Sequence, residues 1–182
     1  MLAYRLRWRL ATAFLVTGLG APAPAAESAL DPLRVCDALK AEGLPTSPWT
    51  AFDDAFGNIV VRNYRCLSEP LTIRGGGEGR FITALNYFAE GRVPQRVETI
   101  RLVLNVHAKA TRAAGIDRLV KLTASLFGSL GAPPPPALAA AIREAQPGSW
   151  NHDLGTVRFE VWQEPVERLR LSINIGAGAR RP

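Results

Sequence analysis

Hydrophobic and polar residues alternate along four segments of the chain, a pattern typical of β-strands that bury one face. These segments are residues 81–88, 97–106, 156–162 and 168–175. Ile100, Leu102 and Leu104 share one side of the second segment, whereas Arg101 and Asn105 share the other. The four segments follow one another in two pairs, and they therefore predict two antiparallel hairpins with one apolar side and one mixed side.

Apolar residues at helical spacing predict three helices. The clearest pattern covers residues 113–130, and it ends at Gly131 and a run of four prolines that cannot continue a helix. A second helix is expected to begin at residue 136 or 137 and to reach about residue 145. A short amphipathic helix is expected over residues 31–42, with Asp31 as its N-cap.

The order of these elements predicts the fold class. Two further β-rich segments, residues 59–66 and 71–74, precede the hairpins. We expect an α+β fold with a mainly antiparallel sheet of two hairpins plus extra N-terminal strands. An N-terminal helix and a helix pair would pack on one face. Residues 26–175 are long enough for a single domain, and residues 176–182 are expected to form a disordered tail.

The second hairpin also predicts two contacts between its strands. If its turn is centred on Pro165, Glu160 faces Arg170 and Trp162 faces Arg168. The first pair would be an ion pair and the second a cation–π contact. These contacts would account for the arginines of this hairpin without a ligand.

The first 25 residues have the order of a secretory signal peptide. Three arginines lie within the first nine residues, residues 10–20 are uncharged and mostly apolar, and residues 21–26 read APAPAA. Cleavage is expected after Ala25, with an uncertainty of one residue. The apolar run is shorter than the roughly 20 residues that cross a bilayer. We therefore expect a periplasmic or secreted protein with no permanent membrane anchor.

The expected cleavage changes the charge of the chain. The full sequence has 22 basic and 16 acidic residues, a net charge of +6. The signal peptide removes three arginines and no acidic residue, which leaves 19 basic and 16 acidic residues, a net charge of +3. Nucleic-acid binding loses its main support, and we expect no nucleic-acid partner.

The sequence has two cysteines, Cys36 and Cys66. Both belong to the exported part, and an oxidising compartment favours their pairing as a disulfide. A redox-active pair is disfavoured, because such cysteines lie close together in a Cys-x-x-Cys motif.

The two histidines are the candidate residues for metal binding or acid–base chemistry. They are His107, at the end of a predicted strand, and His152, which precedes Asp153 in a predicted loop. No spacing in the sequence predicts that they meet. We therefore expect exposed loop histidines and no metal site.

Other catalytic motifs are missing from the sequence. It has no Gly-x-Ser-x-Gly motif, and the adjacent Asp53 and Asp54 are typical of a turn. The glycine-rich residues 75–79 lack the Lys-Ser/Thr ending of a phosphate loop and precede a strand. We therefore predict no catalytic residue and no cofactor.

A binding surface is the remaining candidate site. Aromatic and arginine side chains are favoured anchors in protein interfaces, and a half-buried sheet should leave several of them facing outward. The candidates are Tyr64, Tyr87, Phe88, Arg101, Arg158 and Trp162.

These observations lead to a functional expectation. The sequence favours an exported small globular protein that acts as a non-catalytic binding or accessory module of the bacterial envelope. Its partner would be an envelope protein or a small ligand. The alternative is an envelope hydrolase of unrecognised type that uses His107 or His152 with a nearby acid. A concave pocket in which a histidine meets an acid or nucleophile would favour the hydrolase.

Overall fold

The protein has a mixed α+β fold built on one antiparallel sheet, as the sequence predicts. The computed structural model describes residues 30–56, 59–74, 82–163 and 166–176. The predicted signal peptide, the glycine-rich segment 75–79 and residues 177–182 of the predicted tail lie outside the described residues. The sheet has eight strands: β1 (Thr50–Phe56), β2 (Ile59–Leu67), β3 (Leu71–Thr72), β4 (Ala84–Gly91), β5 (Thr99–Val106), β6 (Gly148–His152), β7 (Gly155–Trp162) and β8 (Glu167–Ile175).

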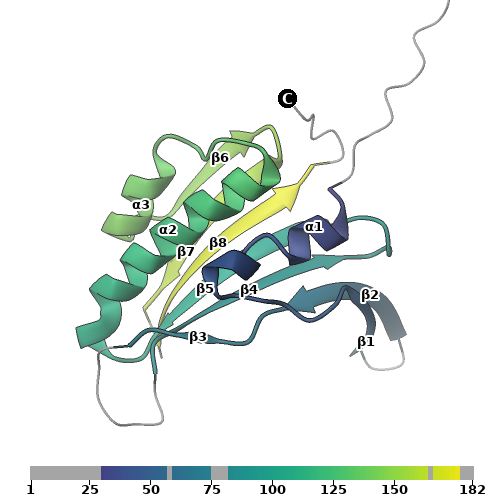
Figure 1. Cartoon of the computed structure of the whole chain (residues 1–182), viewed down its shortest axis with the longest axis horizontal. Coiled ribbons are helices and arrows are strands. Elements are labelled where there is room, and N and C mark those ends of the chain that lie inside the picture. The colour runs from purple at the N-terminus through teal and green to yellow at the C-terminus, as the bar shows by residue number, and fades with distance from the viewer. Residues whose placement is uncertain (1–29, 57–58, 75–81, 164–165, 177–182) are drawn as a thin grey trace, which may run out of the picture.

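The strand order places the two predicted hairpins side by side. Along the sheet the order is β1-β2-β4-β5-β8-β7-β6, and β3 also pairs with β4 (Figure 1). β4 pairs with β5, and β7 pairs with β8, in antiparallel registers. The long pairing of β5 with β8 joins the two hairpins at the centre of the sheet. The hairpins therefore form one continuous surface.

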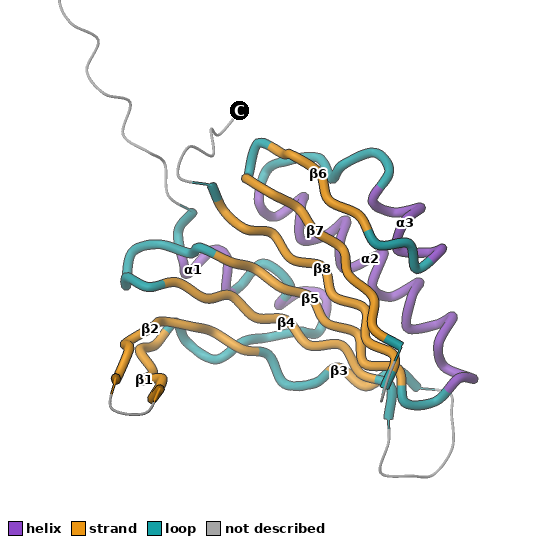
Figure 2. The backbone as a smooth tube through the Cα atoms, turned by 180° about the vertical axis from the view of Figure 1, so that it is seen from behind, coloured by secondary structure: helices purple, strands orange, loops and turns teal. Residues whose placement is uncertain are grey.

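Helices cover one face of this sheet. They are α1 (Pro32–Cys36), α2 (Arg112–Leu130) and α3 (Leu138–Glu144), with short 3-10 turns η1 (Lys40–Glu42) and η2 (Lys109–Thr111). Figure 2 shows the sheet in front and the helices behind it. The long helix α2 ends at Gly131, whose φ of 75° is left-handed and suits a glycine.

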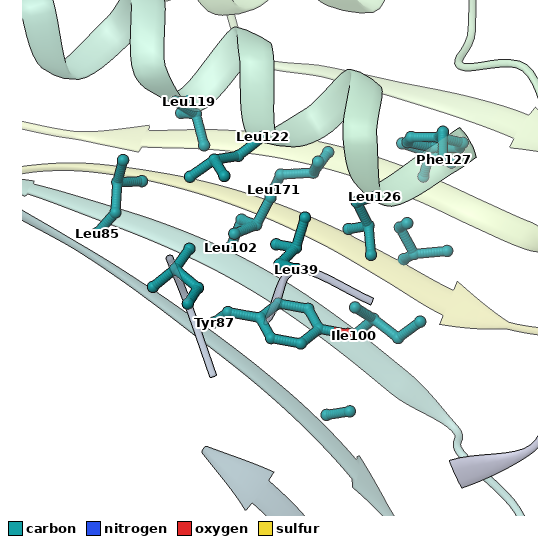
Figure 3. Close-up of a cluster of buried hydrophobic side chains, with 14 of the residues drawn as sticks. Leu39, Leu85, Tyr87, Ile100, Leu102, Leu119, Leu122, Leu126, Phe127 and Leu171 are labelled. Carbon is teal, nitrogen blue, oxygen red and sulfur yellow. The ribbon is translucent and has the colours of Figure 1, made fainter. Parts of the chain in front are cut away.

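The core lies between α2 and the inner face of the sheet. Leu119, Leu122 and Leu126 of α2 point toward Leu102 and Leu171 of the central strands (Figure 3). All five side chains are almost completely buried. The inner face of the sheet therefore carries the apolar residues of the alternating pattern that predicts the strands.

A disulfide between Cys36 and Cys66 connects α1 to β2. Both cysteines are buried and belong to the hydrophobic core. The structure thus contains the predicted pair as a link between two elements that lie 30 residues apart in sequence.

The predicted N-terminal helix is interrupted. α1 begins at Pro32, with Asp31 as its N-cap, but it ends at Cys36 rather than near residue 42. The carbonyl of Cys36 accepts a hydrogen bond from Thr46 Oγ1 at 3.1 Å. The amide of Lys40 instead donates to Asp37, three residues earlier, which begins a tighter turn.

Two segments that the sequence predicts as a turn and a loop are strands in the structure. Asp53 and Asp54 lie within β1, where they contact Arg62 and Asn63 of β2 at 3.0 and 2.9 Å. The turn expected to start at Asp53 is therefore wrong. β6 includes His152, which the sequence placed in a loop.

Candidate functional site: the open face of the sheet

The candidate site is the face of the sheet opposite the helices. Side chains alternate between the two faces of a strand, so the neighbours of buried residues point away from the helices. On β4, β5, β8 and β7 these positions form one surface, which we call the open face (Figure 2). Its sixteen residues are Ala84, Asn86, Phe88, Glu90, Thr99, Arg101, Val103, Asn105, Thr156, Arg158, Glu160, Trp162, Arg168, Arg170, Ser172 and Asn174.

The open face is polar and positively charged. It has four arginines and two glutamates, which give it a net charge of +2. Asparagine, serine and threonine occupy six further positions. No helix of the described chain lies over these residues. Most of the sixteen residues are therefore partly or fully exposed to solvent, although Val103 and Ser172 are buried.

Two of the arginines are held by a carboxylate and an aromatic ring. Arg101 Nη1 lies 3.2 Å from Glu90 Oε2, and its guanidinium is 5.3 Å from the centre of the Phe88 ring. Arg170 donates two hydrogen bonds to Glu160 Oε2, at 3.1 and 2.8 Å. Its guanidinium also lies 4.5 Å from the centre of the Trp162 ring. Both cations are positioned by neighbours from adjacent strands.

The other two arginines have no carboxylate partner among the described residues. Arg168 Nε donates to the amide oxygen of Asn105 at 2.9 Å. Arg158 is exposed and makes no hydrogen bond or ion pair within the described part of the chain. Ser172 separates Arg158 from Arg101 across the sheet. Within the part of the chain that the structure describes, the positive charges of Arg158 and Arg168 are therefore not paired with a carboxylate.

Four of the six predicted binding residues meet on the open face. These are Phe88, Arg101, Arg158 and Trp162. Arg101 and Arg158 lie in one row across the sheet, with Phe88 opposite Arg101 on β4. The structure thus brings together residues from both predicted hairpins.

The other two predicted residues lie on the helix side of the sheet, and the predicted outward position is wrong for Tyr87. Tyr87 is completely buried, and its hydroxyl donates to the carbonyl of Val35 at 2.6 Å. Tyr64 shares its face of β2 with the buried Cys66 and stacks on Trp49, with the ring centres 6.3 Å apart. Tyr87 therefore belongs to the core, whereas Tyr64 remains partly exposed on the same side of the sheet.

Two residues of the face, Arg168 and Arg170, are not among the predicted binding residues. The sequence predicts only contacts within their hairpin for them, and the predicted Glu160–Arg170 ion pair is present. The cation over Trp162 is Arg170, however, although Arg168 lies opposite Trp162 as predicted. The signal was available in the sequence, because both arginines alternate with the buried Leu169 and Leu171.

His152 has a structural role. Its Nδ1 accepts a hydrogen bond from the amide of Leu154 at 3.2 Å, so the proton lies on Nε2. Nε2 then donates to the carbonyl of Pro133 at 2.7 Å. The ring also meets Phe127 edge-on. Both ring nitrogens are engaged in linking β6 to the proline segment, which opposes a role as a general base.

The geometry does not assemble a metal centre from the described residues. Among them, no group of three or more His, Cys, Asp or Glu side chains could hold a metal ion. His107 is exposed just after β5.

Two surface hollows lie away from the histidines. One, of about 520 Å³, is lined by residues that include Leu33, Trp49 and Pro94. The other, of about 200 Å³, is lined by residues that include Phe52 and Glu90. Neither has a histidine in its lining, so neither has the pairing of a histidine with an acid that a hydrolase would need.

No helix among the described residues is long and apolar enough to cross a membrane.

No curated protein and no solved structure matches the chain. Residues 22–182 match a family described as "Family of unknown function (DUF6030)". Because this match covers most of the 182 residues, the chain belongs to that family of unknown function.

Proposed function

We propose that this protein is an exported, non-catalytic binding or accessory module of the bacterial envelope, and that it holds its partner on the open face. The observation that carries the proposal is the uncovered sheet surface that displays Phe88, Arg101, Arg158 and Trp162. Arginine and aromatic residues are common anchors in interfaces.

Two features support export. The first 25 residues have the sequence pattern of a signal peptide. The disulfide between Cys36 and Cys66 fits an oxidising compartment, because cytosolic thiols are kept reduced. Together they favour the periplasm or the cell exterior as the place of action.

The arrangement of the open face favours binding over catalysis. Arg101 and Arg170 are fixed by neighbouring carboxylates, which suits a preformed recognition surface. The hydrolase alternative has less support, since both nitrogens of His152 are occupied by backbone groups.

Site-specific photo-crosslinking in intact cells tests this proposal. A photoreactive amino acid replaces Ser149, an exposed residue of β6 that pairs with Arg158 at the edge of the open face. The matched control replaces Glu144, an exposed residue of α3. We expect a covalent adduct with an envelope component from position 149 and none from position 144. Adducts from position 144 alone would contradict the proposal.

A further inference from the structure

We infer that the partner of the open face is an extended acidic segment of a polypeptide, whose carboxylates pair with Arg158 and Arg168. This inference rests on the proposed function, because it names the chemistry of the partner at the same surface.

Charge complementarity carries the first step. Glu90 pairs with Arg101 and Glu160 pairs with Arg170, so both acids of the face already have a cation. Arg158 and Arg168 have no carboxylate within the described residues. A guanidinium presents its N–H donors in a planar fork that matches a carboxylate. Among the described residues, the charged groups of this face that have no counter-charge are therefore the guanidinium groups of Arg158 and Arg168, and their geometry favours a partner with carboxylates.

The positions of these arginines set the spacing of the partner. Arg158 lies opposite Ser172, and Arg168 lies four residues before Ser172 on the neighbouring strand β8. At a rise of about 3.4 Å per residue, the two arginines are separated by roughly 14 Å along the strands. An extended peptide covers that distance in four residues, and side chains at i and i+4 point to the same side. Acidic residues at this spacing would reach both arginines.

The aromatic residues disfavour a sugar as the partner. A sugar ring binds by stacking on an open aromatic face, but guanidinium groups already lie over Phe88 and Trp162. The rings thus serve to position Arg101 and Arg170 and have less surface left for stacking.

The shape of the sheet disfavours a lipid surface. A sheet of many strands is twisted, so a planar bilayer would contact only part of it. A flexible peptide can follow the twist, and it can also hydrogen-bond to polar residues of the face that are at least partly exposed, such as Asn174 and Thr156. These arguments favour the acidic polypeptide.

Binding of a fluorescent peptide of ten glutamates, followed by anisotropy at low ionic strength, tests the inference. The face variant combines Arg158→Gln with Arg168→Gln. The control combines Arg143→Gln with Lys109→Gln, which removes the same charge from two exposed residues outside the open face. We expect saturable binding to the wild type, about tenfold weaker binding to the face variant and little change in the control. Equal losses in both variants, or no saturable binding, would overturn the inference.

A variant that should bind more tightly keeps the test independent of misfolding. Glu160→Gln removes the acid that holds Arg170, so it should strengthen binding of the glutamate peptide several-fold. Unchanged or weaker binding by this variant would contradict the proposed electrostatics.

Heparin fragments and phosphatidylglycerol vesicles serve as competing anions. If either binds through Arg158 and Arg168 while the peptide does not, the inference fails.

The crosslinking experiment separates this inference from the proposed function. If position 149 gives an adduct but the glutamate peptide does not bind, the binding role stands and the acidic chemistry is wrong. If position 149 gives no adduct and the peptide does not bind, both fail.

Discussion

Tyr87 shows how one side chain connects the sheet to the first helix. Its ring is completely buried in the core, and its hydroxyl donates to the carbonyl of Val35 in α1. Burial raises the pKa of the Tyr87 hydroxyl well above its usual value, because the charged phenolate would lose its hydration. The group therefore remains protonated in the folded protein under conditions that ionise an exposed tyrosine.

This raised pKa predicts a loss of stability in alkali. Above pH of about 10, the unfolded chain releases the Tyr87 proton while the folded protein retains it, so the free energy of unfolding falls as pH rises. Tyr87→Phe should reduce this alkaline dependence. At pH 7 it should cost about 1 kcal/mol, because the hydrogen bond to Val35 is lost. Urea titrations between pH 7 and 11 measure both effects. An identical alkaline slope in the two proteins would contradict this role of Tyr87.

The neighbours of the buried ring also show what the sequence could have settled for single residues. Tyr87 and Phe88 are adjacent on one strand, and adjacent side chains point to opposite faces. Alternation alone therefore excludes one of them from the open face. It does not say which face the helices cover, since that depends on the packing of α2 against β4 and β5.

At the scale of elements, the contact between α2 and β5 depends on a glycine. A Cβ added to Gly115 would lie 3.0 Å from Leu104 Cδ1 and 3.3 Å from Thr83 Cγ2. Gly128 lies in the same helix, and a Cβ there would meet nothing within 4 Å. Comparing the same substitution at Gly115 and Gly128 therefore separates the effect of close packing from the effect of helix propensity.

This difference predicts that the same substitution changes the free energy of unfolding differently at the two positions. Gly128→Ala should stabilise the protein by about 0.5 to 1 kcal/mol, because alanine favours the helix. Gly115→Ala should give no such gain, since the buried Leu104 would have to shift. Thermal or urea unfolding of both variants measures the contrast. Equal stabilisation would show that α2 does not pack closely at Gly115.

The two hairpins and the long helix can be predicted from the sequence because the patterns that indicate them are local. Alternation and helical spacing can be read within ten to twenty residues. β1 was missed because Asp53 and Asp54 resemble a turn, and only their contacts with Arg62 and Asn63 of β2 favour a strand. The early end of α1 likewise depends on the distant Thr46, which binds the carbonyl of Cys36.

At the scale of the whole molecule, the disulfide joins the N-terminal helix to the sheet. It closes a loop with a sequence separation of 30, and such a link should stabilise the fold by roughly 3 to 4 kcal/mol. Reductant should therefore lower the urea midpoint of the wild type. A Cys36→Ser/Cys66→Ser variant should start at the lower midpoint and show no response. A wild type unaffected by complete reduction would contradict this contribution.

The composition of the open face was partly predictable. Phe88, Arg101, Arg158 and Trp162 were identified from residue type and strand position. Their meeting on one surface required the pairing of β5 with β8, which joins two hairpins that are far apart in sequence. Alternation with Leu169 and Leu171 places Arg168 and Arg170 on the outer side of β8. Local patterns do not encode the pairing of β5 with β8, however, and that pairing joins the two arginines to the surface that holds Phe88 and Arg101.

Crosslinking at position 149, combined with charge reversal of Arg158, shows whether the open face holds a partner. We expect an adduct in the otherwise unchanged protein, its loss with Arg158→Glu and its retention with Arg143→Glu on α3. An adduct that persists with Arg158→Glu, or one that forms only from position 144, would contradict the proposed binding at the open face.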